Sequence, residues 1–261
     1  MTDRFDSETV RRYLTSSGVS VTVFDEVDST NRIALELAEK GAPEGTAIVA
    51  AAQTAGRGRL GRSFFSPSGS GVYISMILRP EAIPEKAVFL TPAAGIAVCR
   101  AIEGMTNEKA AIKWVNDIYM RGRKVCGILV QSKAESGRLA HAVVGIGVNL
   151  MKPDSGFPEG ISDVAGSVFI SPIPEMRSRL TAAIIDNAAS LCRLPMKSEI
   201  IEEYRSRSWL DGCDVNVIRG ESSIPAKVVG IDGECRLEVI YDDGRRDFLS
   251  AGEVSVRKAK K

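Results

Sequence analysis

A loop rich in glycine and arginine occupies residues 53–73 and has the sequence QTAGRGRLGRSFFSPSGSGVY. Arg57, Arg59 and Arg62 stand among its glycines, and apolar segments flank it on both sides. Glycine lets backbone amides approach an anion, and arginine adds a permanently charged planar fork. This segment, the GRGR loop, therefore predicts phosphate binding, with a solvated basic loop as the alternative. Neither the GxxxxGK[ST] nor the GxGxxG spacing is present, so neither common nucleotide-binding loop is expected.

A predicted hairpin in residues 110–132 carries two lysines and one carboxylate. Alternation along its first strand, residues 110–120, predicts one face made of Lys113, Val115, Asp117 and Tyr119. A turn at Arg121 and Gly122 would set Lys124 of the second strand opposite Tyr119, on the same face. The two lysines and the carboxylate would then meet over one surface. The alternative is an amphipathic hairpin with a solvated charged face.

The segment VVGIGVNL, residues 143–150, predicts a strand with two unlike faces. Branched apolar side chains form one face, whereas Gly145, Gly147 and Asn149 form the other. Glycine and asparagine cannot fill a core, but they let a ligand lie against the backbone. A bulge in the strand is the alternative explanation of the glycines.

Alternation, caps and turn residues predict the elements that must position these groups. A strand in residues 21–27 leads to a helix capped by Asp28, Ser29 or Thr30, which ends at Ala38 with Gly41 beyond. Further strands are expected to begin at Ala47, Val72, Ala110, Val125 and His141. Helices are expected from Thr91-Pro92 to residue 104, over 173–194 and over 197–209. A longer helix that starts near Pro84 and kinks at Pro92 is the alternative for the first of these.

After residue 209 the sequence changes to four short alternating strands with a hairpin turn at Asp243 and Gly244, which predicts a small β-barrel. We expect a polar N-terminal segment, 1–22, with at most one helix, then a main domain, 23–210, and the barrel, 211–261. The fold class is therefore α+β. The basic end RKAKK is expected to be solvated.

The overall charge is balanced, with 34 basic and 33 acidic residues, so no global field points to nucleic acid or a membrane. No segment is expected to approach the roughly 20 apolar residues of a membrane span, and no signal peptide is evident, so the expected location is the cytoplasm. The five cysteines lack CxxC spacing and predict buried free thiols. His141 is the only histidine. A histidine-rich metal site is thereby excluded, and His141 is interpreted as an ordinary residue at a strand edge.

Six short motifs in sequence order resemble the catalytic domain of the biotin–protein ligases, also called biotin–[acetyl-CoA-carboxylase] ligases. They are DSTN at Asp28, QTAGRGRLGR at Gln53, FSPSGSGVYIS at Phe65, KWVNDI at Lys113, RKVCGILVQ at Arg123 and VGIGVNL at Val144. Each motif is short, but their order over residues 22–150 is specific, and the small C-terminal barrel also fits. The resemblance implies a mixed β-sheet flanked by helices.

The resemblance implies that biotin and ATP, with Mg²⁺, give biotinyl-5′-AMP, and that biotin is then transferred to a lysine of a biotin carboxyl carrier protein. It implies a biotin site made of Ser29, Thr30, Asn31, Gln53, Arg57, Gly58, Arg59, Lys124, Gly127, Gly145 and Gly147. It implies an ATP site made of Arg57, Arg59, Arg62, Lys113, Asn116, Asn149 and Arg257. Catalysis would depend on Arg57, Lys113 and Lys124, with Asp117 as a candidate proton acceptor. The metal ligands and the acceptor protein are not identified, and the chain is expected to be a monomer or a homodimer.

Two residues depart from the family pattern. Phe64 stands where many members have tryptophan, which should weaken a stacking or shielding role there. Val115 replaces the proline of KWPND, which should alter backbone stiffness rather than chemistry. Because only a short segment precedes the first motif, no DNA-binding domain and no repressor activity are expected. The alternatives are a lipoate or octanoate ligase, a biotin-sensing regulator and a nucleotide-binding scaffold. The GRGR loop is expected to be mobile without ligand and to order on binding.

Overall fold

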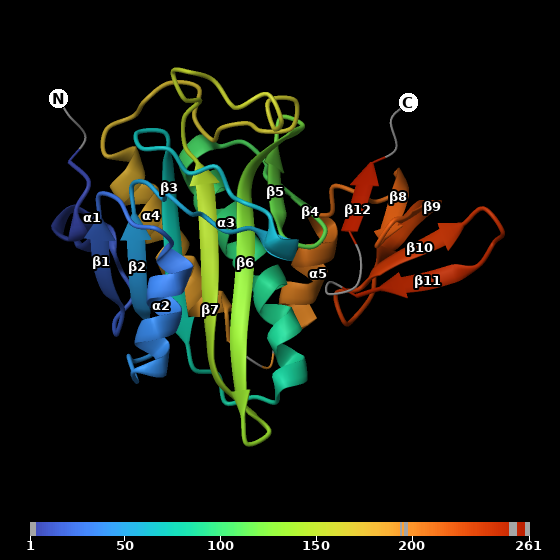
Figure 1. Ribbon diagram of the computed structural model, residues 1–261, viewed down its shortest axis with the longest axis horizontal. Helices are drawn as coiled ribbons and strands as arrows, with labels where there is room; N and C mark the ends of the chain where they lie inside the picture. The colour runs from blue at the N-terminus through green and yellow to red at the C-terminus, as the bar shows by residue number, and fades with distance from the viewer. Residues whose placement is uncertain (1–3, 194, 196–197, 251–254, 259–261) are drawn as a thin grey trace.

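The computed structural model describes residues 4–193, 195, 198–250 and 255–258, and it contains two β-sheets with helices around the larger one (Figure 1). The larger sheet has seven strands in the order β1-β2-β3-β7-β6-β5-β4. These strands are β1 Ser20–Phe24, β2 Thr46–Ala50, β3 Gly71–Leu78, β4 Ala111–Lys113, β5 Asp117–Met120, β6 Arg123–Glu135 and β7 Arg138–Asn149. β1 and β2 are parallel and every other neighbouring pair is antiparallel, so the predicted α+β class with a mixed sheet is confirmed.

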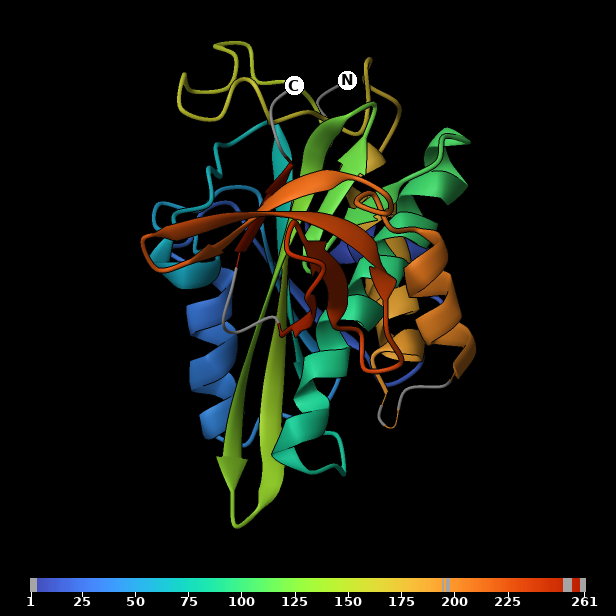
Figure 2. The same ribbon diagram turned by 90° about the vertical axis from the view of Figure 1, so that its right-hand side faces the viewer.

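Helices cover both faces of this sheet (Figure 2). They are α1 Ser7–Tyr13, α2 Thr30–Glu39, α3 Leu90–Thr106, α4 Met176–Leu191 and α5 Ser198–Ser206, with short 3₁₀ turns η1 Arg59–Gly61 and η2 Pro84–Phe89. On one face, Ala34 and Ala38 of α2 pack against Ile48, Ile77 and Val143 of the sheet. α3 and α4 cover the opposite face, and α5 packs on α3. The catalytic motifs predicted from the sequence lie on the α2 side or at the end of the sheet.

The N-terminal caps follow from local sequence. Of the three residues predicted to cap α2, Ser29 does so, because its side chain accepts the backbone N–H of Arg32. Asp6 caps α1 through the backbone N–H of Thr9, and Thr9 returns a hydrogen bond, which completes a capping box. α1 thus lies within the segment 1–22, and β1 begins at Ser20 in the same segment.

α3 differs from the prediction at both ends. It begins at Leu90, directly after η2, so the helical stretch starts at Pro84, as the alternative of a longer helix had it. It passes Gly104 and ends at Thr106, and its C-cap Asn107 adopts a left-handed backbone with φ 56°. The joined stretch from Pro84 to Thr106 is long and apolar enough to cross a membrane by composition, which corrects the sequence expectation. Most of its apolar window is buried inside the protein, as in the core helix of a globular domain.

The strand predicted over residues 110–120 is interrupted, which is the largest error of the sequence analysis. Residues 114–116 form a turn between β4 and β5, and the Trp114-Val115 peptide bond is cis. Val115 therefore leaves the predicted face and is buried. Lys113 and Asp117 become cross-strand partners, so they still share a face, and Lys124 lies opposite Tyr119 as predicted.

The smaller sheet is antiparallel and lies at one end of the molecule (Figure 1). Its order is β11-β10-β9-β8-β12, with β8 Asp214–Arg219, β9 Ser222–Ile231, β10 Leu237–Tyr241, β11 Arg246–Leu249 and β12 Ser255–Lys258. β12 adds a fifth strand to the four predicted, and it includes the first residues of the basic end. The turn at Gly244, with φ 82°, is confirmed. The predicted helix limits Leu194 and Lys197 lie outside the described residues.

Two other predictions concern the cysteines and the histidine. All five cysteines are free thiols, as predicted, and four of them are buried, whereas Cys213 is only partly buried. His141 is a correction, because it lies inside the central strand β7 and is only 3% exposed. Burial, with the nearby charges of Arg79 and Lys133, lowers its pKa.

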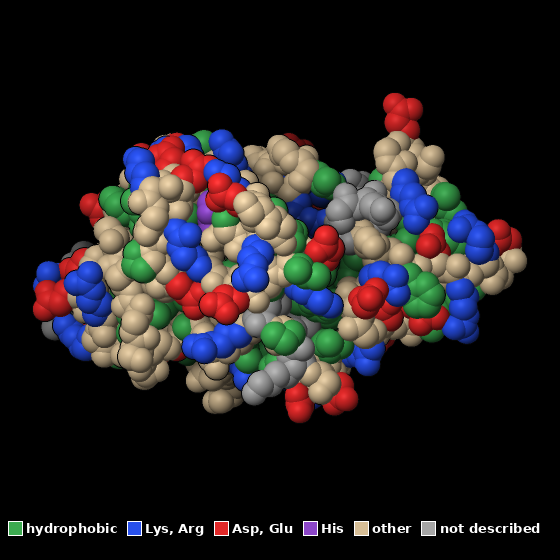
Figure 3. Space-filling model, turned by 90° about the horizontal axis from the view of Figure 1, so that it is seen from below, with side chains coloured by type: hydrophobic (Ala, Val, Ile, Leu, Met, Phe, Trp, Pro, Cys, Tyr) green, Lys and Arg blue, Asp and Glu red, His purple; other side chains and the backbone are tan. Residues whose placement is uncertain are grey.

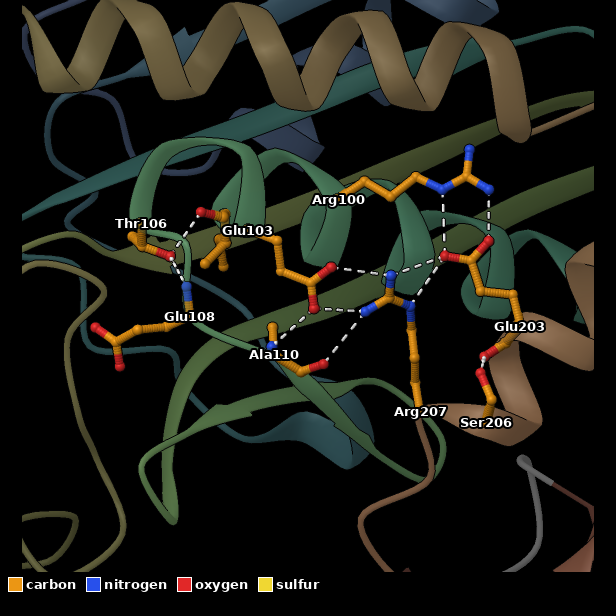
Figure 4. A network of polar contacts seen from close by, with 9 residues as sticks. Arg100, Glu103, Thr106, Glu108, Ala110, Glu203, Ser206 and Arg207 are labelled. Carbon is orange, nitrogen blue, oxygen red and sulfur yellow. Dashed lines mark hydrogen bonds and ion pairs between the residues drawn. The ribbon is translucent and has the colours of Figure 1, made fainter.

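An ion-pair network fixes α5 and the segment after it against α3 (Figure 4). Arg207 contacts Glu103 of α3 at 2.7 and 3.0 Å and Glu203 of α5 at 2.8 Å. Glu103 also accepts the backbone N–H of Ala110, 2.9 Å away, at the start of β4. Burial would raise the pKa of both glutamates, but the hydrogen bonds to Arg207 and the other donors outweigh it and the pKa values are lowered.

We predict that Arg207→Met lowers the free energy of unfolding by about 2–3 kcal/mol, because two half-buried carboxylates lose their shared partner. The hydrogen bonds that lower the pKa values of the two glutamates stabilise the folded state only while the glutamates are ionised. Wild-type stability should therefore fall as the pH drops below the ordinary glutamate range. Urea denaturation between pH 7 and pH 3 measures both effects. The matched variant Arg100→Met removes a more exposed partner of Glu203 and should cost less than about 1 kcal/mol. Equal stability of Arg207→Met and the wild type would contradict the role given to this network.

Candidate functional site

The middle of the large sheet has a surface without side chains on its α2 side. Gly127 of β6 and Gly147 of β7 are directly paired, and Gly145 follows on the same face of β7. We call these three residues the bare patch. The pairing of residues 126–133 with 141–148 is regular, so no bulge accompanies the glycines there. The register shift of this ladder lies farther along, between Lys133 and Ala134. The glycines instead permit close approach, because a Cβ at Gly147 would lie 2.6 Å from Cε1 of Phe64 and one at Gly127 would lie 3.0 Å from Cε2.

Asn31 occupies the space above Gly145. A Cβ at Gly145 would lie 2.0 Å from Oδ1 of Asn31. That oxygen accepts the hydroxyl of Ser75, 2.6 Å away, and Nδ2 donates to Oε1 of Gln131 at 3.0 Å. The Asn31 amide is thus fully engaged by protein groups, and it holds the start of α2 against the sheet.

Gln53, the first residue of the GRGR loop, connects the beginning of α2 to Ser66 farther along the loop. Its Oε1 accepts the backbone N–H of Thr30 at 2.9 Å, and its Nε2 donates to the hydroxyl of Ser66 at 3.1 Å. The backbone N–H of Phe64 donates to the backbone oxygen of Gly56 at 2.9 Å, which joins the two sides of the arginine-bearing part of the loop. At the tip, Leu60 adopts a left-handed backbone with φ 56° and is 64% exposed.

Two of the three predicted charged groups, Lys124 and Asp117, are in contact where β5 begins. Nζ of Lys124 lies 2.6 Å from Oδ1 of Asp117. Nζ of Lys113 lies 5.9 Å from the ring centre of Tyr119. Nη1 of Arg59 donates to Oδ1 of Asn116 at 3.1 Å. Burial lowers the pKa of Arg59, against the opposing charge of Asp117, which raises it. The hairpin alternative of a merely solvated charged face does not describe this arrangement, since its groups contact one another and the loop.

A hollow of about 460 Å³ opens between the GRGR loop and the sheet. Arg57, Gly58 and Arg59 line it from the loop, and Val115 and residues 128–131 line it from the sheet. Arg57 and Arg62 are exposed, so both charges are accessible to an anion. The bare patch lies outside the lining of this hollow, because the ring of Phe64 is against it.

The remaining predicted site residues lie around this centre. Ser29 is buried at the cap of α2, and Asn149 at the end of β7 donates from Nδ2 to the backbone oxygen of Gly166 at 3.0 Å. Arg257 pairs with Asn216 between β12 and β8 of the small sheet, and only its backbone is described. Among the described residues, no three His, Cys, Asp or Glu side chains form a group able to hold a metal ion.

Several residues of the site were not identified from the sequence. Ser75 is the one serine in the apolar strand β3, and that isolated polar residue was a usable signal. Ser66 and Gln131 gave no signal, because their roles depend on Gln53 and Asn31 from distant segments.

Two family models match the chain. The model described as Biotin/lipoate A/B protein ligase family matches residues 23–149, and the model described as Biotin protein ligase C terminal domain matches residues 212–257.

Two relatives and one solved structure are also similar to this chain. The bifunctional ligase/repressor BirA of Escherichia coli is 33% identical over 253 residues, which are 94% of this chain and 76% of that protein. The protein of the same name from Bacillus subtilis is 43% identical over 144 residues, 55% of this chain and 44% of that protein, so the match spans less than half its length. The structure of biotin protein ligase from Aquifex aeolicus in complex with biotin and ATP is 29% identical with a TM-score of 0.76, covering 92% of this chain and 99% of that one.

We predict that Gly145→Ala lowers the free energy of unfolding by about 2–3 kcal/mol, because the added methyl group displaces Asn31 and breaks its hydrogen bonds. Urea denaturation measures the change. Gly230→Ala in β9 is the control, since a Cβ there meets no atom within 4 Å, and its stability should be unchanged or about 0.5 kcal/mol higher. If the two variants lose stability equally, crowding by Asn31 is not the reason that residue 145 is glycine.

Proposed function

Since the chain belongs to the biotin protein ligases, we propose that it activates biotin with ATP as biotinyl-5′-AMP and transfers biotin to a lysine of a biotin carboxyl carrier protein. The observation that carries the proposal is the combination of the bare patch with the cationic groups at its border. Lys124 lies beside Gly127, where a Cβ would be 3.4 Å from its Nζ. Arg57 and Arg59 line the neighbouring hollow.

The bare patch suits the ring system of biotin, because a glycine surface lets a ring lie directly on a sheet once the Phe64 ring, which lies against Gly127 and Gly147 in this structure, moves aside. Phe64 and Tyr73, whose rings meet edge to face with centres 6.3 Å apart, supply aromatic walls on this side. Biotin would contact Phe64 there, so the phenylalanine keeps an aromatic surface where many members of the family have tryptophan.

Adenylation joins two anions, so cationic groups must offset their repulsion. The carboxylate of biotin would attack the α-phosphorus of ATP, a new bond would form between carboxylate oxygen and phosphorus, and pyrophosphate would leave. Lys124 is held by Asp117 in a fixed place beside the patch, which suits a contact with the carboxylate. Arg57, Arg59 and Arg62 would face the phosphates from the loop, with Lys113, Asn116 and Asn149 nearby on the sheet.

Mg²⁺ would come with ATP. The described residues contain no group of three potential metal ligands, and Asp117 is paired with Lys124. Phosphate oxygens and water would therefore hold it, and the bound ion would neutralise part of the phosphate charge.

The transfer step forms a C–N bond between biotin and the acceptor lysine and breaks the bond to AMP, and the amine loses a proton. An unperturbed lysine has a pKa of about 10.4, so the neutral amine is scarce near pH 7 and a proton acceptor helps. Asp117 is the carboxylate at the site. Its contact with Lys124 favours orientation of that lysine as its main role, with proton acceptance as the second role that we propose.

The family model also covers lipoate ligases, which makes a lipoate or octanoate ligase the second candidate. The relatives whose names specify a substrate favour biotin. Binding of biotin in preference to lipoate separates the two.

We propose that this chain acts without binding DNA. Basic and acidic residues are nearly equal in number, and the two kinds are interspersed over the face that Figure 3 shows. A basic stripe of the kind that DNA-binding surfaces carry is not seen on that face. A cytoplasmic location also belongs to the proposal.

We predict that the protein exchanges labelled pyrophosphate into ATP only when biotin is present. Arg57→Ala and Lys124→Ala should each lower the exchange rate by about 100-fold or more, because each removes a charge that stabilises the transition state. Lys133→Ala is the matched control on the same strand, where an exposed lysine pairs with Glu39, and it should leave the rate unchanged. Exchange with lipoate or octanoate but not biotin would replace the proposal with the second candidate. Full activity in Arg57→Ala and Lys124→Ala would remove these residues from the site.

A further inference from the structure

Residues 114–116, the turn between β4 and β5, lie between the small sheet and the GRGR loop. On one side, the indole N–H of Trp114 donates to the backbone oxygen of Cys235, 3.0 Å away in the turn between β9 and β10. On the other side, Oδ1 of Asn116 accepts from Arg59 at 3.1 Å. These bonds connect the small sheet to an arginine of the loop through three consecutive residues.

The contact between Trp114 and Cys235 is buried and well supported. Trp114 is 6% exposed and Cys235 is 4% exposed. The turn that carries Cys235 is fixed by Asp232, whose Oδ1 accepts the backbone N–H groups of Glu234 and Arg236 at 2.9 Å each. Loss of the indole donor would leave a buried carbonyl without this partner, which is costly in a protein interior.

The other bonds of the turn determine how Asn116 is oriented. The hydroxyl of Tyr204 donates to the backbone oxygen of Val115 at 3.1 Å. Nδ2 of Asn116 donates to the backbone oxygen of Ile128 at 2.9 Å. The backbone N–H of Ile128 in turn donates to the backbone oxygen of Asn116 at 2.9 Å. Because Nδ2 is directed at Ile128, Oδ1 of Asn116 is directed at Arg59.

We propose that Trp114 is a positioning residue, through which the small C-terminal sheet sets the place of Arg59 in the GRGR loop. Trp114 acts through Asn116 and makes no contact with substrate in this role. The inference rests on the proposed function only in assigning Arg59 to adenylation. The link between Trp114 and the loop can be tested without any activity.

The first test is limited trypsin digestion of Trp114→Phe, which keeps an aromatic ring and removes the N–H. The measured quantity is a ratio, cleavage at the loop residues Arg57, Arg59 and Arg62 divided by cleavage at the exposed Arg138 beside the β6–β7 turn. This ratio should rise about twofold to tenfold, which is the effect of losing one net hydrogen bond. Trp209→Phe makes the same change at the other tryptophan, whose ring stacks on Tyr119 with centres 4.5 Å apart, and should keep the wild-type ratio. An unchanged ratio in Trp114→Phe, a rise at all sites together, or an equal rise in Trp209→Phe would each overturn the inference.

The second test is a double-mutant cycle on biotin-dependent pyrophosphate exchange. Trp114→Phe should slow exchange in the wild-type background and have a smaller effect in the Arg59→Lys background, because the arginine contact is already lost there. An equal fold-loss in both backgrounds would show that Trp114 acts independently of Arg59. If the wild-type protein shows no exchange, the proposed function fails, and the trypsin ratio still decides the inference.

Discussion

The close approach of other groups to the backbone of Gly127 and Gly147 is the constraint on which the rest of the site depends. These two glycines are paired across the two central strands, so any side chain at either position would project into the same small space. Phe64 reaches the sheet only because that space is open. The GRGR loop that carries Phe64 is thereby brought next to Lys124 and Asp117, and the cationic groups gather at one border of the patch.

The site combines a rigid floor with a more exposed cover. Hydrogen bonds of Asn31 and Gln53 fix the start of α2 to the sheet, and the Lys124–Asp117 contact fixes the charged border. The tip of the GRGR loop is different, since Leu60 is largely exposed and Arg57 is accessible. Such a loop can adjust to a ligand while the floor keeps its geometry, as expected for a site that must exclude water during reaction. Mobility of the loop in solution stays a prediction.

Hydrophobic periodicity was sufficient to predict most of the fold, and it failed where distant contacts override a local pattern. Residues 110–120 contain neither glycine nor proline to signal a turn, so a continuous strand was expected. The turn there is supported by Cys235 and Tyr204, which lie 121 and 89 residues away in sequence. The start of α3 was misplaced for a local reason, because the 3₁₀ turn η2 runs directly into the helix and replaces a side-chain cap.

Residue types were equally informative about the site, up to a limit. The glycine face of β7 and the arginines of the loop were predicted from chemistry alone, and the motifs in order indicated the family. The position of Phe64 over the bare patch and the filling of the space above Gly145 by Asn31 required the tertiary structure, since both bring together segments that are far apart in sequence.

The central claim is that the bare patch is the floor of the biotin site. Titration calorimetry of biotin into the wild-type protein and into Gly147→Ala tests it most directly. The predicted result is binding to the wild type and an affinity weaker by about tenfold or more in the variant, since an added methyl group on a close contact costs roughly 1–3 kcal/mol. Equal affinity in both proteins, or no binding of biotin to the wild type, would contradict the claim.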